Sequence, residues 1–303
     1  MLLADAAFRV LGDLVDVVLA DDETRERVFR GAAELGYRPD TAAQVLRRTR
    51  SRHLGVLFSL QQPYEVDLAE AIYPAAERRG YHVVLGAMTA GRDERQAVEE
   101  PLSFRSEAII LIAPTSGRQQ LARLGQQIPL IEIGRRLTGG GGVGVDVVRV
   151  ADERGAQQAV DHLVALGHRD IVHRHHLQDH IRILPGDYTE ESGAQAAGTL
   201  LQADKPPSAI FAANDRCAHG VIATLSRAGL DIPNDVSVVG YDDSRIARLS
   251  FVDLTTIRQD ATQMAELAVE AAAQRLDEGR TTARDIVVKP TLIVRGSTGP
   301  ARP

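Results

Sequence analysis

The 303-residue chain contains one cysteine, Cys217, and no tryptophan, and aromatic residues make up only 4% of it. A single cysteine excludes an intramolecular disulfide framework and is typical of a reducing compartment. No apolar run approaches the roughly 20 residues needed to cross a bilayer, and Met1–Ala7 lacks the basic start of an export signal. These absences predict a cytoplasmic protein without a membrane partner.

An excess of positive charge is also missing. The net charge is −6, so no global basic field marks the chain as a nucleic-acid binder. The charge is unevenly distributed, however: residues 1–24 hold one arginine and six acidic residues, whereas residues 25–52 hold eight arginines and three acidic residues. The basic segment predicts a polyanionic partner for this part of the chain.

Catalytic and metal-binding patterns are weak. The serines lack the surroundings of a nucleophile elbow, and Gly139–Gly144 lacks the Lys-Ser/Thr continuation of a phosphate-binding loop. His173, His175 and His176 lie close together, but neither cysteines nor an H-E-x-x-H spacing accompanies them. We therefore expect a protein that is not an enzyme and that holds no metal and no cofactor.

From Leu54 onward, short apolar runs alternate with longer amphipathic stretches, which predicts an α/β fold with doubly wound parallel sheets. Continuous apolar runs such as Ile109–Ile112 are typical of strands buried on both faces. The expected strands are Leu54–Leu60, Tyr81–Ala87, Ala108–Ile112, Leu130–Ile133, Asp170–His173, Ala209–Ala212 and Val236–Tyr241. The expected helices are Glu65–Arg79, Asp93–Phe104, Asp152–Leu166, Ser192–Gln202, Ala218–Ala228 and Thr262–Glu278.

The length exceeds that of one ordinary core and predicts several domains. We expect a small helical domain at residues 1–38, a short helix and linker at 39–52, and a two-lobed domain at 53–298. The first lobe is predicted to comprise residues 53–137 and 253–281. The second lobe is predicted to comprise residues 138–252 and 282–298.

Residues 23–48, ETRERVFRGAAELGYRPDTAAQVLRR, resemble the third headpiece helix and the hinge of the lactose-repressor (LacI/GalR) family. Further matches follow in order: ALGHRDIVH at 165–173, PGDYTEESG at 185–193, AIFAANDRCAHG at 209–220, IPNDVSVVGYDDSR at 232–245 and DLTTIRQDA at 253–261. The resemblance spans most of residues 24–298. It implies two lobes of the periplasmic-binding-protein type, a helix-turn-helix headpiece, and a homodimer that binds operator DNA and a small-molecule effector.

The resemblance also implies that paired hinge helices enter the minor groove of the operator, with Leu46 as an apolar wedge and Ala43 permitting close approach. Alternatively, Leu46 is an ordinary helix residue and the neighbouring arginines form a solvated face. The arginines implied to contact phosphates are Arg25, Arg38, Arg47 and Arg48.

Two segments depart from the family pattern. Residues 8–19, FRVLGDLVDVVL, make the headpiece atypical, because between Arg9 and Arg25 no Arg, Lys, Asn or Gln is available to read base edges. The stretch between His173 and Gly186 is markedly shorter than in the family. We therefore expect this chain to bind DNA weakly and with little sequence preference.

Carried over position by position, the effector-binding residues implied by the resemblance are Tyr64, Asp67, Arg135, Asn214, Asp242 and Gln259. Carboxylates accept hydrogen bonds from paired hydroxyls, a guanidinium donates two parallel bonds, and amides do both. This set predicts a polyhydroxylated, sugar-like effector. Asp242 could instead cap the helix that follows it.

The sequence thus predicts an effector-responsive, DNA-binding transcriptional regulator. The alternative is a solute-binding or ligand-sensing protein that has lost sequence-specific DNA binding. Within Tyr64–Arg79, helical spacing places Leu68, Ile72 and Ala76 on one apolar face. We expect this face to pair across the two-fold axis of the homodimer.

Overall fold

A computed structural model describes residues 50–134, 144–169, 183–203 and 207–302, together with residues 27, 30 and 31. The chain divides into two compact units, Met1–Ser51 and Arg52–Pro303. The second unit contains every strand described below. Within the described ranges, no helix has both the length and the apolar character needed to cross a membrane.

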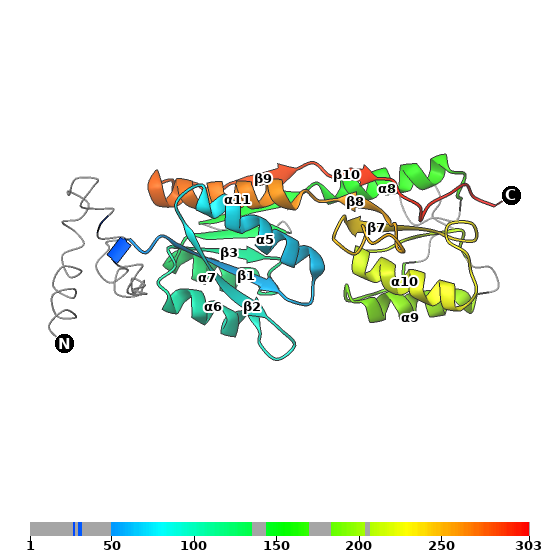
Figure 1. The fold of residues 1–303 in the computed structure, drawn as a ribbon, viewed down its shortest axis with the longest axis horizontal. Coiled ribbons are helices and arrows are strands. Elements are labelled where there is room, and N and C mark those ends of the chain that lie inside the picture. Colours follow the sequence, from blue (N-terminus) through cyan, green and yellow to red (C-terminus); the bar gives the residue numbers. More distant parts are fainter. Residues whose placement is uncertain are drawn as a thin grey trace. The chain divides into compact units, whose positions relative to one another are not determined.

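The first lobe is built on a six-stranded sheet of order β2-β1-β3-β4-β5-β9, in which every strand pair is parallel (Figure 1). Its strands are β1 (His53–Ser59), β2 (His82–Met88), β3 (Ala108–Ile112), β4 (Leu130–Gly134), β5 (Val145–Val150) and β9 (Asp285–Val288). All five residues of β3 are buried, as the continuous apolar run predicts for a strand covered on both faces.

Helices cover both faces of this sheet. Helix α5 (Pro63–Glu77) and α11 (Ala261–Asp277) pack on one face, and α6 (Glu94–Ser103) and α7 (Arg118–Gln127) pack on the other. Leu68, Ile72 and Ala76 are at most 1% exposed within the first of these layers. The prediction that they meet a second subunit is therefore wrong, because they pack inside their own lobe.

The second lobe is built on a four-stranded sheet of order β10-β8-β7-β6, parallel except for β10. Its strands are β6 (Ala209–Phe211), β7 (Ser237–Asp242), β8 (Thr255–Arg258) and β10 (Thr291–Ile293). Helices α9 (Glu190–Leu201) and α10 (Asp215–Arg227) cover one face, and α8 (Asp152–Ala165) covers the other. The predicted α/β fold with two parallel-sheet lobes is confirmed.

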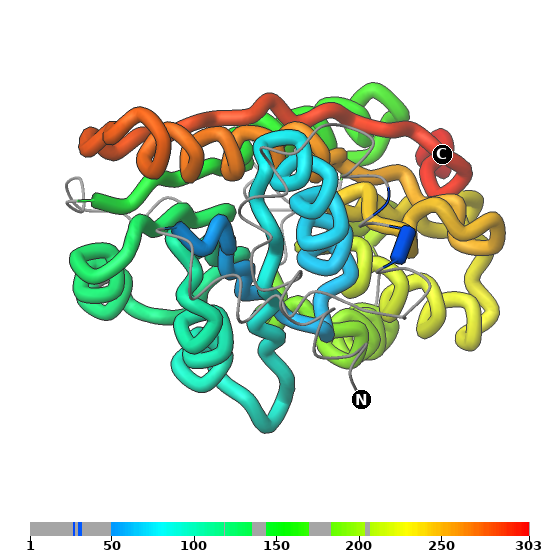
Figure 2. The backbone as a smooth tube through the Cα atoms, turned by 60° about the vertical axis from the view of Figure 1, so that its left-hand side comes forward, coloured from blue at the N-terminus to red at the C-terminus, as the bar shows by residue number. Residues whose placement is uncertain are grey.

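The boundaries between the lobes differ from those expected. Strands β5 and β9, which we assigned to the second lobe, belong to the first sheet, whereas β8, which we assigned to the first lobe, pairs with β7. The chain therefore passes between the lobes at residues 151, 259–260 and 289–290, and its last segment runs along both lobes (Figure 2). Apolar periodicity marks a strand but not the sheet that it joins. The predicted strand Asp170–His173 lies outside the described residues.

A buried histidine ties the end of the chain to the second lobe. His168 is 2% exposed; its Nδ1 lies 3.0 Å from Ser208 Oγ, and its Nε2 lies 3.0 Å from the Gly299 carbonyl oxygen and from Ser237 Oγ. Burial lowers the pKa of His168 below its ordinary value, although the Gly299 carbonyl favours the charged ring.

We expect acid to destabilise the protein through His168. Its stabilising contribution is complete above about pH 6.5, the ordinary histidine pKa, and is lost as the pH falls through the lowered pKa, because the unfolded chain binds the proton first. Urea denaturation at pH 7.5 and 5.5 measures this loss. The variant His168→Gln should show a smaller pH dependence, whereas His82→Gln, at an exposed position of β2, should retain it. An identical pH dependence in His168→Gln and the parent chain would contradict the assignment.

Candidate functional site

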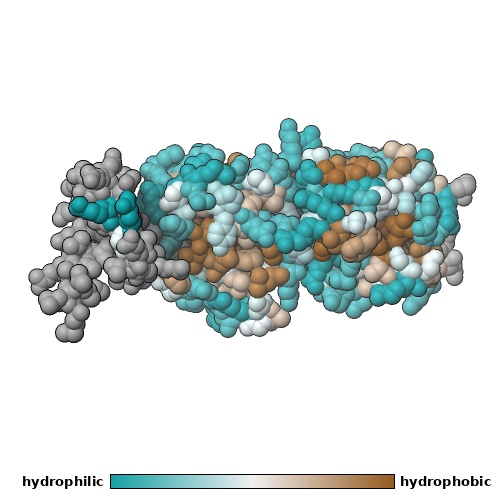
Figure 3. Space-filling view, viewed as in Figure 1, coloured by the Kyte–Doolittle hydropathy of each residue, from teal (hydrophilic) through white to brown (hydrophobic). Residues whose placement is uncertain are grey.

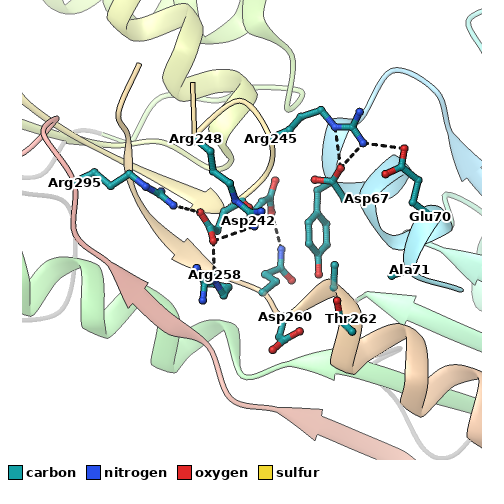
Figure 4. Close-up of a pocket in the computed structure, with 14 residues that line it drawn as sticks. Asp67, Glu70, Ala71, Asp242, Arg245, Arg248, Arg258, Asp260, Thr262 and Arg295 are labelled. Carbon is teal, nitrogen blue, oxygen red and sulfur yellow. Dashed lines mark hydrogen bonds and ion pairs between the residues drawn. The ribbon is translucent and has the colours of Figure 1, made fainter. Parts of the chain in front are cut away.

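The carboxyl ends of the parallel strands β1 and β7 bring polar segments of the two lobes together, as expected for ligand sites in parallel α/β sheets. A cavity of about 870 Å³ lies there, with walls from both lobes (Figure 4). The first lobe contributes the beginnings of α5 and α11, and the second contributes the end of β7 and the turns after it. The lining residues are Tyr64, Asp67, Glu70, Ala71, Asp242, Asp243, Arg245, Arg248, Arg258, Gln259, Asp260, Ala261, Thr262 and Arg295.

Four of the six predicted effector residues line this cavity: Tyr64, Asp67, Asp242 and Gln259. Tyr64 and Asp67 lie in the first turns of α5, Asp242 ends β7, and Gln259 lies on the segment between β8 and α11. Gln259 Nε2 donates to Asp242 Oδ1 at 2.6 Å. Residues distant in sequence thus meet where the resemblance implied.

Asp242 is held in an unusual state. Its backbone φ is 117°, in a region that residues other than glycine rarely adopt and that is often found at functional sites. Burial, and then the nearby carboxylate of Asp215, raises the pKa of Asp242 well above its ordinary value. No helix begins directly after Asp242, because turns follow it up to β8. The interpretation of Asp242 as a helix cap is therefore wrong.

Asp215 stands behind Asp242 as a second buried carboxyl group. It accepts hydrogen bonds from Thr256 Oγ1 at 2.6 Å and from the Ser244 backbone N–H at 2.7 Å. Burial raises its pKa to about 6, although these hydrogen bonds favour the charged form. Asp242 on the cavity wall is thus backed by a second, fully buried carboxyl group that interacts with it.

Tyr64 joins α5 to α11 at the cavity wall. Its hydroxyl donates to Met264 Sδ at 3.2 Å, and its ring packs against the core of the first lobe. Burial, followed by the negative charge of Asp242, raises the pKa of Tyr64 well above its ordinary value. Tyr64 is therefore a neutral, mostly apolar part of the wall, which suits contact with the apolar face of a ring.

Asn214 follows β6 at the junction of the lobes, and its contact with the effector stays a prediction. It is not among the residues that line the cavity; its Oδ1 accepts from the Cys217 backbone N–H at 2.8 Å and caps α10. Its Nδ2 donates to the Tyr188 carbonyl oxygen at 3.2 Å and, across the lobes, reaches Gln62 Oε1 at 3.5 Å. The remaining predicted residues, Arg135 for the effector and Arg25, Arg38, Ala43, Leu46, Arg47 and Arg48 for DNA, lie outside the described residues.

Sequence reasoning missed an ionic contact between the lobes. Arg245, in the turns after β7, donates from Nε and Nη2 to Asp67 Oδ1 at 2.9 and 2.6 Å, and its Nη2 lies 3.1 Å from Glu70 Oε1 (Figure 4). Asp67 and Glu70 are three residues apart on α5 and therefore share a helix face. That spacing signalled an acidic face, but nothing local indicated a partner in the other lobe.

A second contact between the lobes also went unpredicted. Arg216 Nη1 donates to the Gln61 carbonyl oxygen at 3.0 Å. Hydrophilic residues cover the line where the lobes meet on the face shown in Figure 3, with hydrophobic patches on either side. The contacts that Arg245 and Arg216 make between the lobes are thus polar or ionic.

Residues 52–181 match the family model for periplasmic binding proteins and the sugar-binding domain of the LacI family, and residues 148–298 match that for a periplasmic binding protein-like domain. The HTH-type transcriptional repressor PurR of Erwinia tasmaniensis is 28% identical, over 93% of this chain and 90% of that protein. A solved LacI transcriptional regulator from a Rhodococcus species is 42% identical, with a TM-score of 0.78 over 82% of this chain and 99% of that one. The Lac repressor bound to ONPG is 25% identical, with a TM-score of 0.78 over 94% of each chain. Because the match to the Rhodococcus regulator covers nearly all of that protein and the two-lobed fold agrees, the chain belongs to the LacI family of transcriptional regulators.

Proposed function

We propose that this protein is an effector-responsive transcriptional regulator that binds a small, polyhydroxylated, sugar-like ligand in the cavity between its lobes and acts on operator DNA as a homodimer. The observation that carries the proposal is the meeting of Asp242, Gln259 and Tyr64 on one cavity wall. The volume of the cavity, about 870 Å³, lies within the range of small-molecule binding sites. The related Lac repressor structure contains ONPG, which supports a ligand of this kind.

The chemistry of the wall suits hydroxyl groups. In the 2.6 Å contact between Gln259 and Asp242, the amide donates and the carboxyl group accepts. A ligand hydroxyl can do both, donating to Asp242 while accepting from Gln259, so it can enter this pair without leaving a buried group unsatisfied. Tyr64 offers an apolar surface beside that pair.

The same cavity supplies a route to regulation. A ligand that contacts both lobes binds more tightly when the lobes are close together than when they are apart. Ligand binding therefore increases the fraction of molecules in the closed arrangement. Gln259 lies on one of the three segments that connect the lobes. A ligand bound to Gln259 therefore contacts the chain at the point about which one lobe moves relative to the other. A change in lobe arrangement is then the signal passed to the DNA-binding part.

The alternative function is a ligand sensor that has lost sequence-specific DNA binding. The atypical residues 8–19 favour it, because after Arg9 they offer no Arg, Lys, Asn or Gln side chain to read base edges. Fluorescence-anisotropy titration of palindromic and random duplexes separates the two. A specificity ratio above about 10³ supports a sequence-reading regulator, whereas equal, steeply salt-dependent binding supports the sensor.

Truncating Asp242 tests the ligand site. We expect Asp242→Ala to weaken binding of a sugar found by screening by about 1–3 kcal/mol, the range for losing a hydrogen bond to a polar or charged group. Isothermal titration calorimetry on the intact chain measures the change. Asp242→Asn, which keeps the shape of the side chain, should show a smaller loss, and Asp161→Ala, on α8 outside the cavity, should show none. Unchanged affinity in both Asp242 variants, with their melting temperatures preserved, would count against the proposed site.

A further inference from the structure

One wall of the cavity concentrates positive charge around a single carboxylate. Asp243 is 2% exposed; its Oδ1 accepts from Arg295 Nη2 at 2.6 Å, and its Oδ2 accepts from Arg258 Nε at 2.7 Å and from Arg248 Nη2 at 3.2 Å. Arginine stays protonated in proteins, so three positive charges share one negative charge. Burial alone would raise the pKa of Asp243, but the hydrogen bonds from Arg295 and Arg258 lower it, which keeps the carboxyl group ionised.

Two of these arginines retain free hydrogen-bond donors. Arg258 uses only Nε, and Arg248 uses only Nη2, so the other guanidinium nitrogens of both have no protein partner among the described residues. The two side chains are 44% and 61% exposed, and both line the cavity. Figure 4 shows Arg295, Arg248 and Arg258 gathered at one side, whereas Arg245 points away from them toward Asp67 and Glu70.

The other charged residues of the cavity do not neutralise the excess positive charge around Asp243. Arg245 already pairs with Asp67 and Glu70 at the opposite rim. Asp260 caps α11, where its Oδ1 accepts from the Gln263 backbone N–H at 2.9 Å. Asp242 is paired with Gln259, and its burial disfavours the charged form. The cavity is therefore polarised, with an arginine-rich end in the second lobe and an acidic rim in the first.

We propose that Arg248, Arg258 and Arg295 form an oxyanion subsite of the cavity, which takes a carboxylate or phosphate group carried by the effector. The planar guanidinium group matches both oxyanions in shape and can donate two parallel hydrogen bonds to either. A concave wall focuses the field of the excess charge on a ligand in the cavity. The subsite rests on the proposed function and narrows it from polyhydroxylated ligands in general to acidic ones, such as a sugar acid or a sugar phosphate.

Matched ligands test the subsite in the intact chain. Calorimetric titration compares neutral aldoses with the corresponding aldonates and 6-phosphates at two salt concentrations. We expect the aldonate or the 6-phosphate to bind at least about tenfold more tightly than the corresponding neutral aldose. This difference in affinity, called the gap below, reflects charge-assisted hydrogen bonds from partly exposed arginines. The gap should shrink at high salt. The comparison with aldonates tests for a carboxylate group and the comparison with 6-phosphates tests for a phosphate group. Tighter binding in either comparison supports the subsite.

Variants identify the residues responsible. Arg248→Gln and Arg258→Gln should each remove most of the gap, because each weakens binding of the acidic ligand far more than binding of the neutral sugar. Arg78→Gln serves as the matched control, because Arg78 pairs with Glu266 on the surface and does not line the cavity. Of the three arginines, Arg248 makes the longest contact with the Asp243 carboxylate and is the most exposed, so its variant tests the subsite even if Arg258→Gln unfolds.

Inorganic phosphate provides a probe that needs no sugar. At constant ionic strength, phosphate should raise the melting temperature of the parent chain and of Arg78→Gln, but not that of Arg248→Gln. Equal phosphate protection in all three proteins, or equal affinity for acidic and neutral sugars, would overturn the subsite. If a neutral sugar binds in a way that depends on Asp242, and its acidic counterpart binds with equal affinity, the proposed function stands and only the subsite is overturned. Failure of every sugar in a broad panel to bind would overturn both.

Discussion

Replacing Asp146 by alanine is expected to lower the free energy of unfolding by about 3–5 kcal/mol, the cost of removing one partner from a buried ion pair. Asp146 lies on β5 and is completely buried. Its Oδ2 accepts from Arg275 Nε at 2.6 Å and from Arg280 Nη2 at 2.7 Å, and its Oδ1 accepts from the Arg284 backbone N–H at 2.7 Å. This carboxylate therefore ties the sheet of the first lobe to α11 and to the turn after it.

The size of the effect follows from what the substitution leaves behind. Burial alone would raise the pKa of Asp146, but hydrogen bonds from Arg280 and Arg275 more than offset this, and its pKa is lowered. The side chains of Arg275 and Arg280 are only 8% and 12% exposed. Without Asp146, two nearly buried guanidinium groups lose their counter-ion and cannot reach water freely.

Urea denaturation followed by circular dichroism measures the loss. The matched control is Asp285→Ala, because Asp285 pairs with Arg149 at the surface, where a salt bridge contributes about 0–1 kcal/mol. A loss in Asp146→Ala no larger than that of the control would mean that the two arginines find other partners. Sugar affinity per folded molecule should stay unchanged, because Asp146 does not line the cavity.

The parts of the fold that were predictable depend on local patterns. A continuous apolar run such as Ala108–Ile112 indicates a strand covered on both faces, and the structure buries all of it. Polar residues at strand ends, such as Asp242, were placed at the cleft because carboxyl ends of parallel strands share one edge of a sheet. Both inferences need only near neighbours in the sequence.

What could not be predicted depends on partners far along the chain. Val145–Val150 has the same local character whichever sheet it joins, and only its pairing with β4 and β9 places it in the first lobe. The helical spacing of Leu68 and Ile72 indicated a buried face, but not whether the sheet or a second subunit buries it. Asp146 and Arg280 are 134 residues apart, so no spacing rule connects them.

The candidate site shows the same division. A helix cap and a ligand contact have the same local sequence signal at Asn214, and in the structure its side-chain Oδ1 caps α10. The contact of Arg245 with Asp67 depends on how two lobes meet, and so does the cavity wall shared by Tyr64 and Gln259. Residue types at strand ends predicted which polar residues line the cavity, whereas the ion pairs around it came only from the tertiary structure.

The close contact of α9 and α10 leads to the second large effect. A Cβ atom added at Gly220 would overlap the Glu190 carbonyl oxygen and lie 3.0 Å from the Ala194 backbone nitrogen, and one added at Gly193 would overlap the Cys217 carbonyl oxygen. These neighbours are backbone atoms, which cannot rotate away as side chains do. The two helices must therefore separate to admit even one methyl group.

We expect Gly220→Ala to lower the free energy of unfolding by about 3 kcal/mol, the upper part of the range for overpacking a core, because backbone rather than side chains must move. Gly198→Ala is the matched control: a Cβ there meets nothing within 4 Å, so the better helix propensity of alanine should stabilise α9 by about 0.5–1 kcal/mol. The two substitutions add the same methyl group and should have opposite signs in urea denaturation. Separation of the helices should also disturb the bond from Asn214 Nδ2 to the Tyr188 carbonyl oxygen, which joins the beginnings of α9 and α10 at the lobe junction. Equal stability of the two variants would show that the helices are not in contact as described.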